Sequence, residues 1–234
     1  MGDLGSAFAD AAHMILGRDP ALLRIVALSL RVSLTAVLCA ALIGLPLGGA
    51  LAVARFPGRG AVAVVLDAMM GFPPVVAGLL IYLLLSRAGP LGSFGILFTP
   101  RAMIVAQTFL VTPIIAALTR QVVEDLWQDY RDPLRSLGAG PARAIPTLLW
   151  DARVSLATAV LAGFGRASAE VGAIMIVGGN IAGVTRTMTT AIALETSKGD
   201  LALALGLGIV LLTLTLAVNA VAHAAGRAAS RGIR

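Results

Sequence analysis

The stretch "DPLRSLGAGPARAIPTLLWDA", residues 132–152, is charged and repeatedly interrupted, although the chain around it is apolar. It belongs to residues 120–153, which hold 10 of the chain's 30 Asp, Glu, Lys and Arg residues in 34 positions. Glycines and prolines interrupt it, among them Gly138, Gly140, Pro141 and Pro146. Long apolar runs lie on both sides, so the pattern predicts a structured loop that stands outside a membrane.

The composition of the 234 residues excludes an ordinary soluble domain. The chain is 58% hydrophobic and 13% charged, with a mean hydropathy of +0.92, whereas a soluble domain is about 25% charged. The net charge of +6 comes from 17 arginines and one lysine. In a membrane protein such an excess indicates cytoplasmic loops, and no exposed basic domain suggests binding to nucleic acid.

Five apolar segments are long enough to cross a bilayer, which requires about 20 helical residues. They are residues Ile25–Ala54, Ala61–Ser86, Ala102–Thr119, Val154–Val177 and Leu201–His223. Because backbone groups cannot stay unpaired in lipid, these lengths predict an all-α polytopic membrane protein with about five transmembrane helices. Within them, "GLPLGG" at Gly44–Gly49 predicts close helix packing and a kink at Pro46. "GFPPVVAG" at Gly71–Gly78 and Pro113 predict two further interrupted helices.

The distribution of basic residues predicts the orientation. One set of loops, with the C-terminal tail, carries ten arginines: Arg55, Arg59, Arg120, Arg131, Arg135, Arg143, Arg153, Arg227, Arg231 and Arg234. The opposite set carries six cations: Arg18, Arg24, Arg87, Arg101, Arg186 and Lys198. We therefore expect an outer N-terminal segment (1–24), a transmembrane domain (25–223) with a cytoplasmic loop (120–153), and a cytoplasmic tail (224–234).

Four charged residues fall inside predicted spans: Arg31, Asp67, Arg166 and Glu170. A charge there is costly unless it is paired or faces the interior, so Asp67, Arg166 and Glu170 call for partners. Arg166 and Glu170 are four residues apart, so we expect them to share one helical face and to form an intramembrane ion pair that neutralises both. The residues leave open whether this ion pair holds the helices together or takes part in transport.

Local signals predict two short helices in the charged loop, residues 132–152. Asp132 followed by Pro133 is typical of a helix start, and Gly138 with Gly140 of a helix end. Pro141 then permits a second helix, which we expect Pro146 to limit. A compact elbow of this kind indicates a docking surface; a solvated loop explains the arginines but not the glycines and prolines.

The same stretch resembles the cytoplasmic loop of ABC-importer permeases, whose pattern is Glu-Ala-Ala, three residues, Gly, nine residues, then Ile-any-Leu-Pro. Asp132, Gly138 and Leu148 match its acidic residue, glycine and isoleucine; Pro133 and Leu134 replace the alanines, and Trp150 and Asp151 replace the final Leu-Pro. Other stretches resemble molybdate, tungstate and sulfate permeases: "GLPLGGALAVARFPGRG", "PPVVAGLLIYLLL", "GPLGSFG" and "GRASAEVGA". Residues 174–200 are similar to the tungstate branch, and the resemblance spans most of residues 28–200.

This resemblance implies a type I ABC importer permease (MetI-like) fold and a homodimer in the bacterial plasma (inner) membrane. It implies that the elbow couples to a cytoplasmic ATPase subunit, through Asp132, Pro133, Leu134, Arg135, Gly138, Ala139, Gly140 and Leu148. ATP and Mg²⁺ would then belong to that subunit and not to this chain, which has no Gly-rich loop ending in Lys-Ser or Lys-Thr. A substrate-binding protein is expected outside, and the implied substrate is tungstate, with molybdate or sulfate as alternatives.

The outer segment Gly178–Asp200 offers two interpretations. Its glycines and hydroxyl groups suit a tetrahedral dianion, which predicts an anion path along Gly179, Asn180, Thr185, Arg186, Thr189 and Thr190. Alternatively, it is a hydroxyl-rich loop that docks the binding protein or caps a helix.

Other functions have weaker support in the sequence. An ion-coupled carrier could use Asp67 and Glu170 as relays, but it would be expected to show inverted repeats, and none is visible. Cys39, His13 and His223 are isolated from other ligand-type residues, so we expect no metal site. No hydrolase or metalloprotease motif is present, and we expect no catalytic site in this chain.

Overall fold

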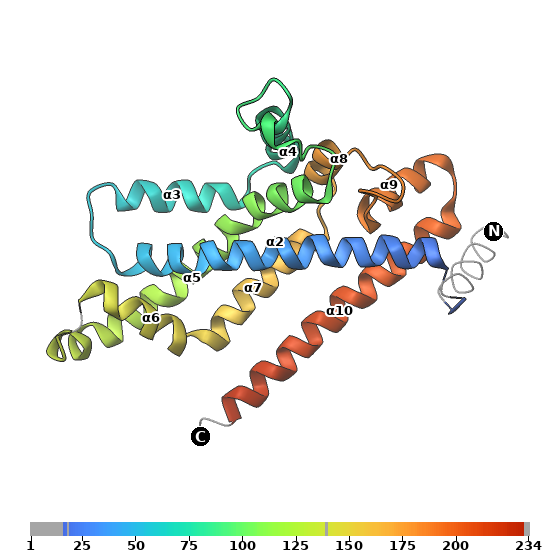
Figure 1. The fold of residues 1–234 in the computed structure, drawn as a ribbon. Helices are drawn as coiled ribbons and strands as arrows, with labels where there is room; N and C mark the ends of the chain where they lie inside the picture. Colours follow the sequence, from blue (N-terminus) through green and yellow to red (C-terminus); the bar gives the residue numbers. More distant parts are fainter. Residues whose placement is uncertain (1–15, 18, 139, 232–234) are drawn as a thin grey trace. The chain divides into compact units, whose positions relative to one another are not determined.

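The computed structural model describes residues 16–17, 19–138 and 140–231, and these are almost entirely helical. The elements are α2 (Pro20–Val53), α3 (Arg59–Met70), α4 (Pro74–Leu85), η1 (Gly92–Phe94), α5 (Pro100–Ser136), α6 (Pro141–Asp151), α7 (Arg153–Ser168), α8 (Gly172–Gly178), α9 (Met188–Lys198) and α10 (Leu201–Arg231) (Figure 1). No strand occurs among the described residues. The predicted all-α fold class is therefore confirmed.

In the described part of the chain, three helices are long and apolar enough to cross a membrane: Pro20–Val53, Pro100–Leu134 and Leu201–Val221. The number rises to five if two broken pairs, α3 with α4 and α6 with α7, each count as one span. The expectation of about five spans thus agrees with the upper number. The predicted interruption of Ala61–Ser86 is confirmed, at Gly71–Pro73, whereas the span Val154–Val177, which we expected to be continuous, is interrupted at 169–171.

Prolines interrupt fewer helices than we expected. The break before α4 coincides with Pro73 and Pro74, of which Pro74 begins that helix. In contrast, α2 continues through Pro46 and α5 through Pro113. A single proline removes one N–H from the helix, and in a long helix the neighbouring turns hold the backbone in place.

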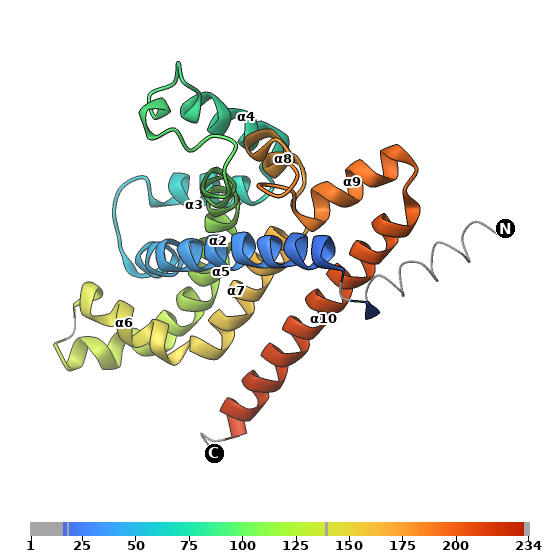
Figure 2. The same cartoon turned by 45° about the vertical axis from the view of Figure 1, so that its right-hand side comes forward.

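The chain divides into two compact units, each of which is described by itself. The first unit comprises the chain to Thr35 with Pro73–Gln107 and Ala167–Asn219. Within it α4 and α8 lie side by side (Figures 1 and 2), so close that a Cβ on Gly78 would lie 2.7 Å from the Cα of Ala173. A second contact buries Leu22, Met188, Ala191 and Leu207, which joins the start of α2 to α9 and α10.

The second unit comprises Ala36–Phe72, Thr108–Arg166 and the chain from Ala220 onward. In it α2 crosses α5 at glycines: a Cβ on Gly48 would lie 2.3 Å from the carbonyl oxygen of Ala116, and one on Gly44 3.1 Å from Ile115. Glycines four residues apart let two backbones approach this closely. The small-residue contact surface predicted at Gly44–Gly49 is confirmed.

Candidate functional site

The elbow predicted at residues 132–152 begins later than expected. We predicted a new helix at Asp132, but α5 continues without a break to Ser136, with Pro133 inside its last turns. The reason is that residues 120–136 carry an apolar stripe whose members Val123 and Trp127 are buried. Leu134 packs against the same cluster, so burial of the stripe continues the helix past Asp132. Pro133 is exposed, and so is Asp129, whose carbonyl loses its N–H partner and can bind water instead.

The turn itself agrees with the prediction. Gly138 has φ +73°, in the left-handed region that favours glycine, and it follows the end of α5. Gly140 is the N-cap of α6, and Pro141 occupies its first turn. Ala139 lies outside the described residues. Pro146 does not limit α6, which continues to Asp151; Ala142, whose carbonyl loses its N–H partner, is exposed to solvent.

Leu148 fixes α6 in place. Its side chain is completely buried in a cluster with Ala52 and Val53 of α2, Val123 and Trp127 of α5, and Ala144 of α6. Leu134, at the end of α5, packs against this cluster. The elbow is therefore a docked helical hairpin of the second unit and not a free linker, because its inner face belongs to the apolar core.

The outer face of the elbow carries exposed apolar side chains. Leu137 is 82% exposed and Trp150 is 72% exposed. The guanidinium of Arg153 lies 5.2 Å from the centre of the Trp150 ring, a cation–π distance, and it donates to the Trp150 carbonyl at 2.8 Å. Large exposed apolar groups outside the predicted spans are typical of a surface that binds a partner.

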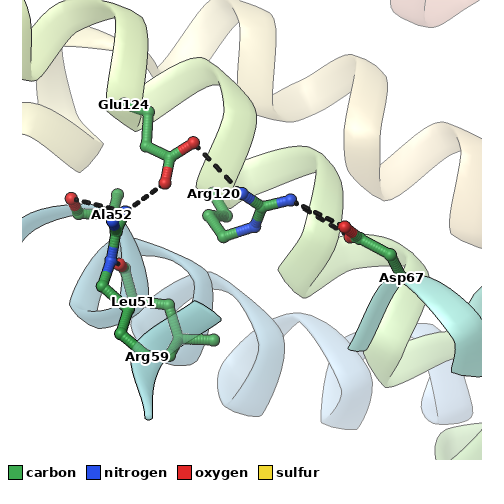
Figure 3. A network of polar contacts seen from close by, with 6 residues as sticks. All are labelled: Leu51, Ala52, Arg59, Asp67, Arg120 and Glu124. Atoms are coloured by element: carbon green, nitrogen blue, oxygen red, sulfur yellow. Dashed lines mark hydrogen bonds and ion pairs between the residues drawn. The ribbon is translucent and has the colours of Figure 1, made fainter. Parts of the chain in front are cut away.

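A network of four charges lies in the same unit (Figure 3). Arg120 donates to both carboxylate oxygens of Asp67, at 3.1 and 3.0 Å, and to Glu124 at 3.1 Å. The other oxygen of Glu124 accepts from Arg59. Two arginines and two acids balance one another, so Asp67, a charge in a predicted span, has the partner that such a position demands.

Arg59 joins this network to the end of α2. Its Nε donates to the carbonyl of Leu51 at 2.6 Å and its Nη2 to that of Ala52 at 3.3 Å. The last carbonyls of a helix have no partner within the helix, and a cation is favourable there. The four charges therefore connect the C-terminal end of α2, the whole of α3 and the middle of α5.

Sequence reasoning missed this network. The pair Arg120 and Glu124, four residues apart on one helix, is a local signal that could have been found. Arg59 and Asp67 lie 65 and 53 residues from their partners, and no local signal announces such contacts.

The hydroxyl groups of the outer segment are used within the first unit. Thr185 is fully buried and donates to the carbonyl of Gly178 at 2.6 Å. Thr190 accepts the backbone N–H of Thr187 at 3.0 Å, in a capping box that begins α9. Thr189 donates to the carbonyl of Glu170 at 2.8 Å. These bonds favour the helix-capping interpretation of the segment, and the anion path stays a prediction.

The remaining members of the predicted path have mixed surroundings. Gly179 and Asn180 both have positive φ, of 71° and 48°, and form the turn after α8. Asn180 donates its amide to the Thr190 carbonyl at 3.3 Å. Arg186 lies 3.7 Å from the nearly buried carboxylate of Glu195, which also receives Lys198 at 3.2 Å.

Arg166 and Glu170 do not share a continuous helix. The helix α7 ends at Ser168 and α8 begins at Gly172, so Glu170 lies in the break. The premise that four-residue spacing puts both on one helical face is therefore wrong. Glu170 is 3% exposed, and its Oε1 accepts the backbone N–H of Ala173 at 3.0 Å, near the start of α8. The ion pair itself stays a prediction.

Comparison with known proteins adds the family. No family model matches the chain. A probable anion ABC transporter permease of Haloferax volcanii is 43% identical over 77% of this chain and 80% of its own length. The tungstate uptake system permease protein TupB of Peptoclostridium acidaminophilum is 38% identical over 93% of this chain and 96% of its own. TupB of Campylobacter jejuni is 42% identical over 60% and 59%. A sulfate and a molybdenum permease are more distant, at 33% and 30% identity.

Proposed function

The chain belongs to the ABC-transporter permease family of these relatives, and on that premise we propose that it is the membrane subunit of an ATP-driven importer for an oxyanion, foremost tungstate. The single observation that supports this substrate is the similarity to a tungstate permease along nearly the full length of both chains. Molybdate and sulfate remain the alternatives because permeases for them are more distant relatives.

The elbow is the proposed contact with the ATPase subunit, which would bind ATP and Mg²⁺. Leu148 and its cluster hold α6 against α5, so a push on α6 reaches the long helix directly. Leu137 and Trp150 present apolar surface that a cleft on the partner would cover. The buried inner face transmits force and the exposed outer face supplies binding area.

We infer further that two copies of this chain form the path, that a substrate-binding protein docks outside, and that the C-terminus is cytoplasmic. Three to five spans are few for enclosing a path alone, and a two-fold dimer is the commonest solution. The bias of ten arginines to six cations supports the orientation.

An ion-coupled carrier is not favoured. Such a carrier would use Asp67 and Glu170 as proton or ion relays. Both carboxylate oxygens of Asp67 accept hydrogen bonds from Arg120, and Oε1 of Glu170 accepts the backbone N–H of Ala173. A carboxylate whose two oxygens are both held by an arginine has a structural role and is poorly placed to pass on a proton or ion.

Uptake in cells tests the proposed function. The permease is expressed with its ATPase and binding protein in cells that lack their own systems, and tungstate uptake is measured with molybdate or sulfate in excess. We expect ATP-dependent tungstate uptake that a large excess of sulfate leaves intact; cells without the ATPase are the control. Sulfate uptake that excess tungstate fails to inhibit would contradict the substrate.

A further inference from the structure

A hollow of 420 Å³ lies in the first unit, between the first turns of α2 and the loop that precedes α9. Arg24, Ile25 and Leu28 line it from α2, and Gly183, Val184 and Arg186 line it from the loop. The hydrogen bonds described for the outer segment do not use this hollow, and neither the elbow nor the four-charge network contributes to it.

The two arginines are the charged side chains among the described residues that line the hollow. Arg24 is held along the first turn of α2, because its Nε donates to the carbonyl of Pro20 at 3.1 Å. Asp19 is the acid nearest to it in the sequence, and its Oδ1 already accepts the backbone N–H groups of Ala21 and Leu22. Two cations thus line one space, and no acid is among the described residues that line it.

Arg186 is incompletely satisfied. Its Nη1 lies 3.7 Å from Glu195, which is longer than a hydrogen bond, and Glu195 is shared with Lys198 at 3.2 Å. Its Nε is buried and has no hydrogen-bond acceptor among the described residues. Buried donors are nearly always satisfied, so Arg186 keeps donor capacity that the described residues of its own unit do not use.

The chemistry of the lining defines the ligand class. Guanidinium groups present several N–H donors in a fixed fork that matches the oxygens of phosphate-like anions, and two of them suit a double negative charge. Gly183 has φ +74°, and a Cβ built there meets nothing within 4 Å, so the wall leaves space at this point. The rest of the lining includes the apolar side chains of Ile25, Leu28 and Val184. They exclude water that would otherwise compete with a bound anion for the arginine donors.

We propose that this hollow, at Arg24 and Arg186, is a binding site for a tetrahedral oxyanion. The anion has two possible sources, the free transported oxyanion or the phosphate of an anionic lipid headgroup. The site follows from the lining residues alone, whereas the choice of tungstate as the free anion, and the position of the hollow outside the membrane, rest on the proposed function.

The experiment uses the full chain, purified with its ATPase and placed in nanodiscs of zwitterionic phosphatidylcholine. Thermal unfolding is followed while sodium tungstate is titrated. We expect tungstate to stabilise the wild type, and Arg24→Gln and Arg186→Gln each to weaken the apparent affinity by about tenfold or more, because each removes a charge-assisted donor. Arg24 is exposed, so its variant carries the test even if Arg186→Gln folds poorly.

Arg87→Gln is the matched control. Arg87 is also an exposed arginine of the first unit, but the hollow that it helps to line contains no second arginine among its described residues. Its variant should respond to tungstate like the wild type. An equal loss in all three variants would mean that general surface charge, and not this hollow, explains the response, and would overturn the proposal.

A second arm replaces phosphatidylcholine with phosphatidylglycerol, without tungstate. A stabilisation by phosphatidylglycerol that Arg24→Gln and Arg186→Gln abolish identifies the lipid phosphate as the source. A response to tungstate in phosphatidylcholine that the same variants abolish identifies the free anion. No arginine-dependent response in either arm overturns the site. Uptake by cells that express the wild type is scored separately, so failure of the proposed function would not be mistaken for failure of the site.

Discussion

Gly138 and Gly140 lie two residues apart and have opposite backbone conformations. Gly138 has φ +73° and Gly140 has φ −70°, and a Cβ built on either meets no atom within 4 Å. Both positions therefore have room for a side chain, and they differ only in their backbone φ angle. A left-handed φ is costly for a residue with a Cβ, whereas the conformation of Gly140 is open to any residue.

We predict that Gly138→Ala lowers the stability of the elbow by about 1 kcal/mol and weakens co-purification of the ATPase. Gly140→Ala is the matched control, with a change of a few tenths of a kcal/mol at an N-cap. Thermal unfolding of the detergent-solubilised permease and recovery of the ATPase on a tagged permease measure both effects. Equal behaviour of the two variants would contradict the role of the positive φ.

Glu170 offers a second test with single substitutions. Its Oε1 accepts the N–H of Ala173, and the residue is 3% exposed. Glutamine keeps an acceptor oxygen at that position and removes only the charge, whereas alanine removes both. If the charge matters through the predicted pair with Arg166, Glu170→Gln impairs transport, and a charge-swapped double variant recovers part of it.

The acceptor is tested by comparing the two substitutions. We expect Glu170→Ala to destabilise the permease by about 1–3 kcal/mol more than Glu170→Gln, because it leaves a backbone N–H without its acceptor. Thermal unfolding measures this difference and substrate uptake measures the charge. A Glu170→Gln permease with wild-type yield and uptake would exclude a functional ion pair.

At the scale of helices, α6 separates stability from partner binding. Leu148 is completely buried and Trp150, two residues later, is 72% exposed. One face of the same short helix therefore belongs to the core of the second unit while the opposite face is exposed. Substitution of a buried residue of the elbow should therefore lower its stability, whereas substitution of an exposed one should weaken only its contact with the ATPase.

We predict that Leu148→Ala destabilises the permease by about 2–5 kcal/mol through the cavity that it leaves. Trp150→Ala should leave thermal stability within about 0.5 kcal/mol and reduce recovery of the ATPase and substrate-stimulated ATP hydrolysis. A Trp150→Ala complex with unchanged ATPase recovery and hydrolysis would remove the outer face of the elbow from the proposed interface.

The crossing of α2 and α5 provides a test of packing. A Cβ on Gly48 would lie 2.3 Å from a backbone oxygen, whereas one on Gly165, also inside a helix, meets nothing within 4 Å. Gly48→Ala should separate the two helices and cost about 1–3 kcal/mol. Gly165→Ala should be neutral or stabilise by up to about 1 kcal/mol, since alanine favours helix. Similar thermal stability of the two variants would contradict the close approach.

At the scale of the whole molecule, the orientation in the membrane governs which surfaces meet which partners. The proposed contact with the ATPase requires the elbow and the C-terminus inside, and the proposed contact with the binding protein requires residues 178–200 outside. Both follow from the unequal distribution of arginines. The orientation is therefore a single premise on which several functional proposals depend.

We predict that a fluorescent protein fused to the C-terminus fluoresces, and that alkaline phosphatase fused after Gly92 is active because it lies outside the cytoplasm. The matched fusion of alkaline phosphatase after Gly138 should be inactive. Active phosphatase after Gly138 together with inactive phosphatase after Gly92 would reverse the orientation and move the proposed ATPase surface to the wrong side.

The sequence by itself determined the helical class, the approximate positions of the spans, the glycine surface of α2 and the turn at Gly138. These features depend on local quantities: the hydropathy of 20 consecutive residues, the absence of a Cβ, or the φ that only glycine adopts readily. The resemblance to ABC permeases was also visible there, because it rests on residue spacing along the chain.

Tertiary structure alone decided the rest. The helix start predicted at Asp132 failed because burial of Val123 and Trp127 extends α5 beyond that local signal. The four-charge network joins residues 53 and 65 positions apart, and the threonine hydroxyls of the outer segment are occupied by carbonyls that the fold brings near. Packing chooses such partners, since a side chain far along the chain becomes a neighbour only when the helices have docked.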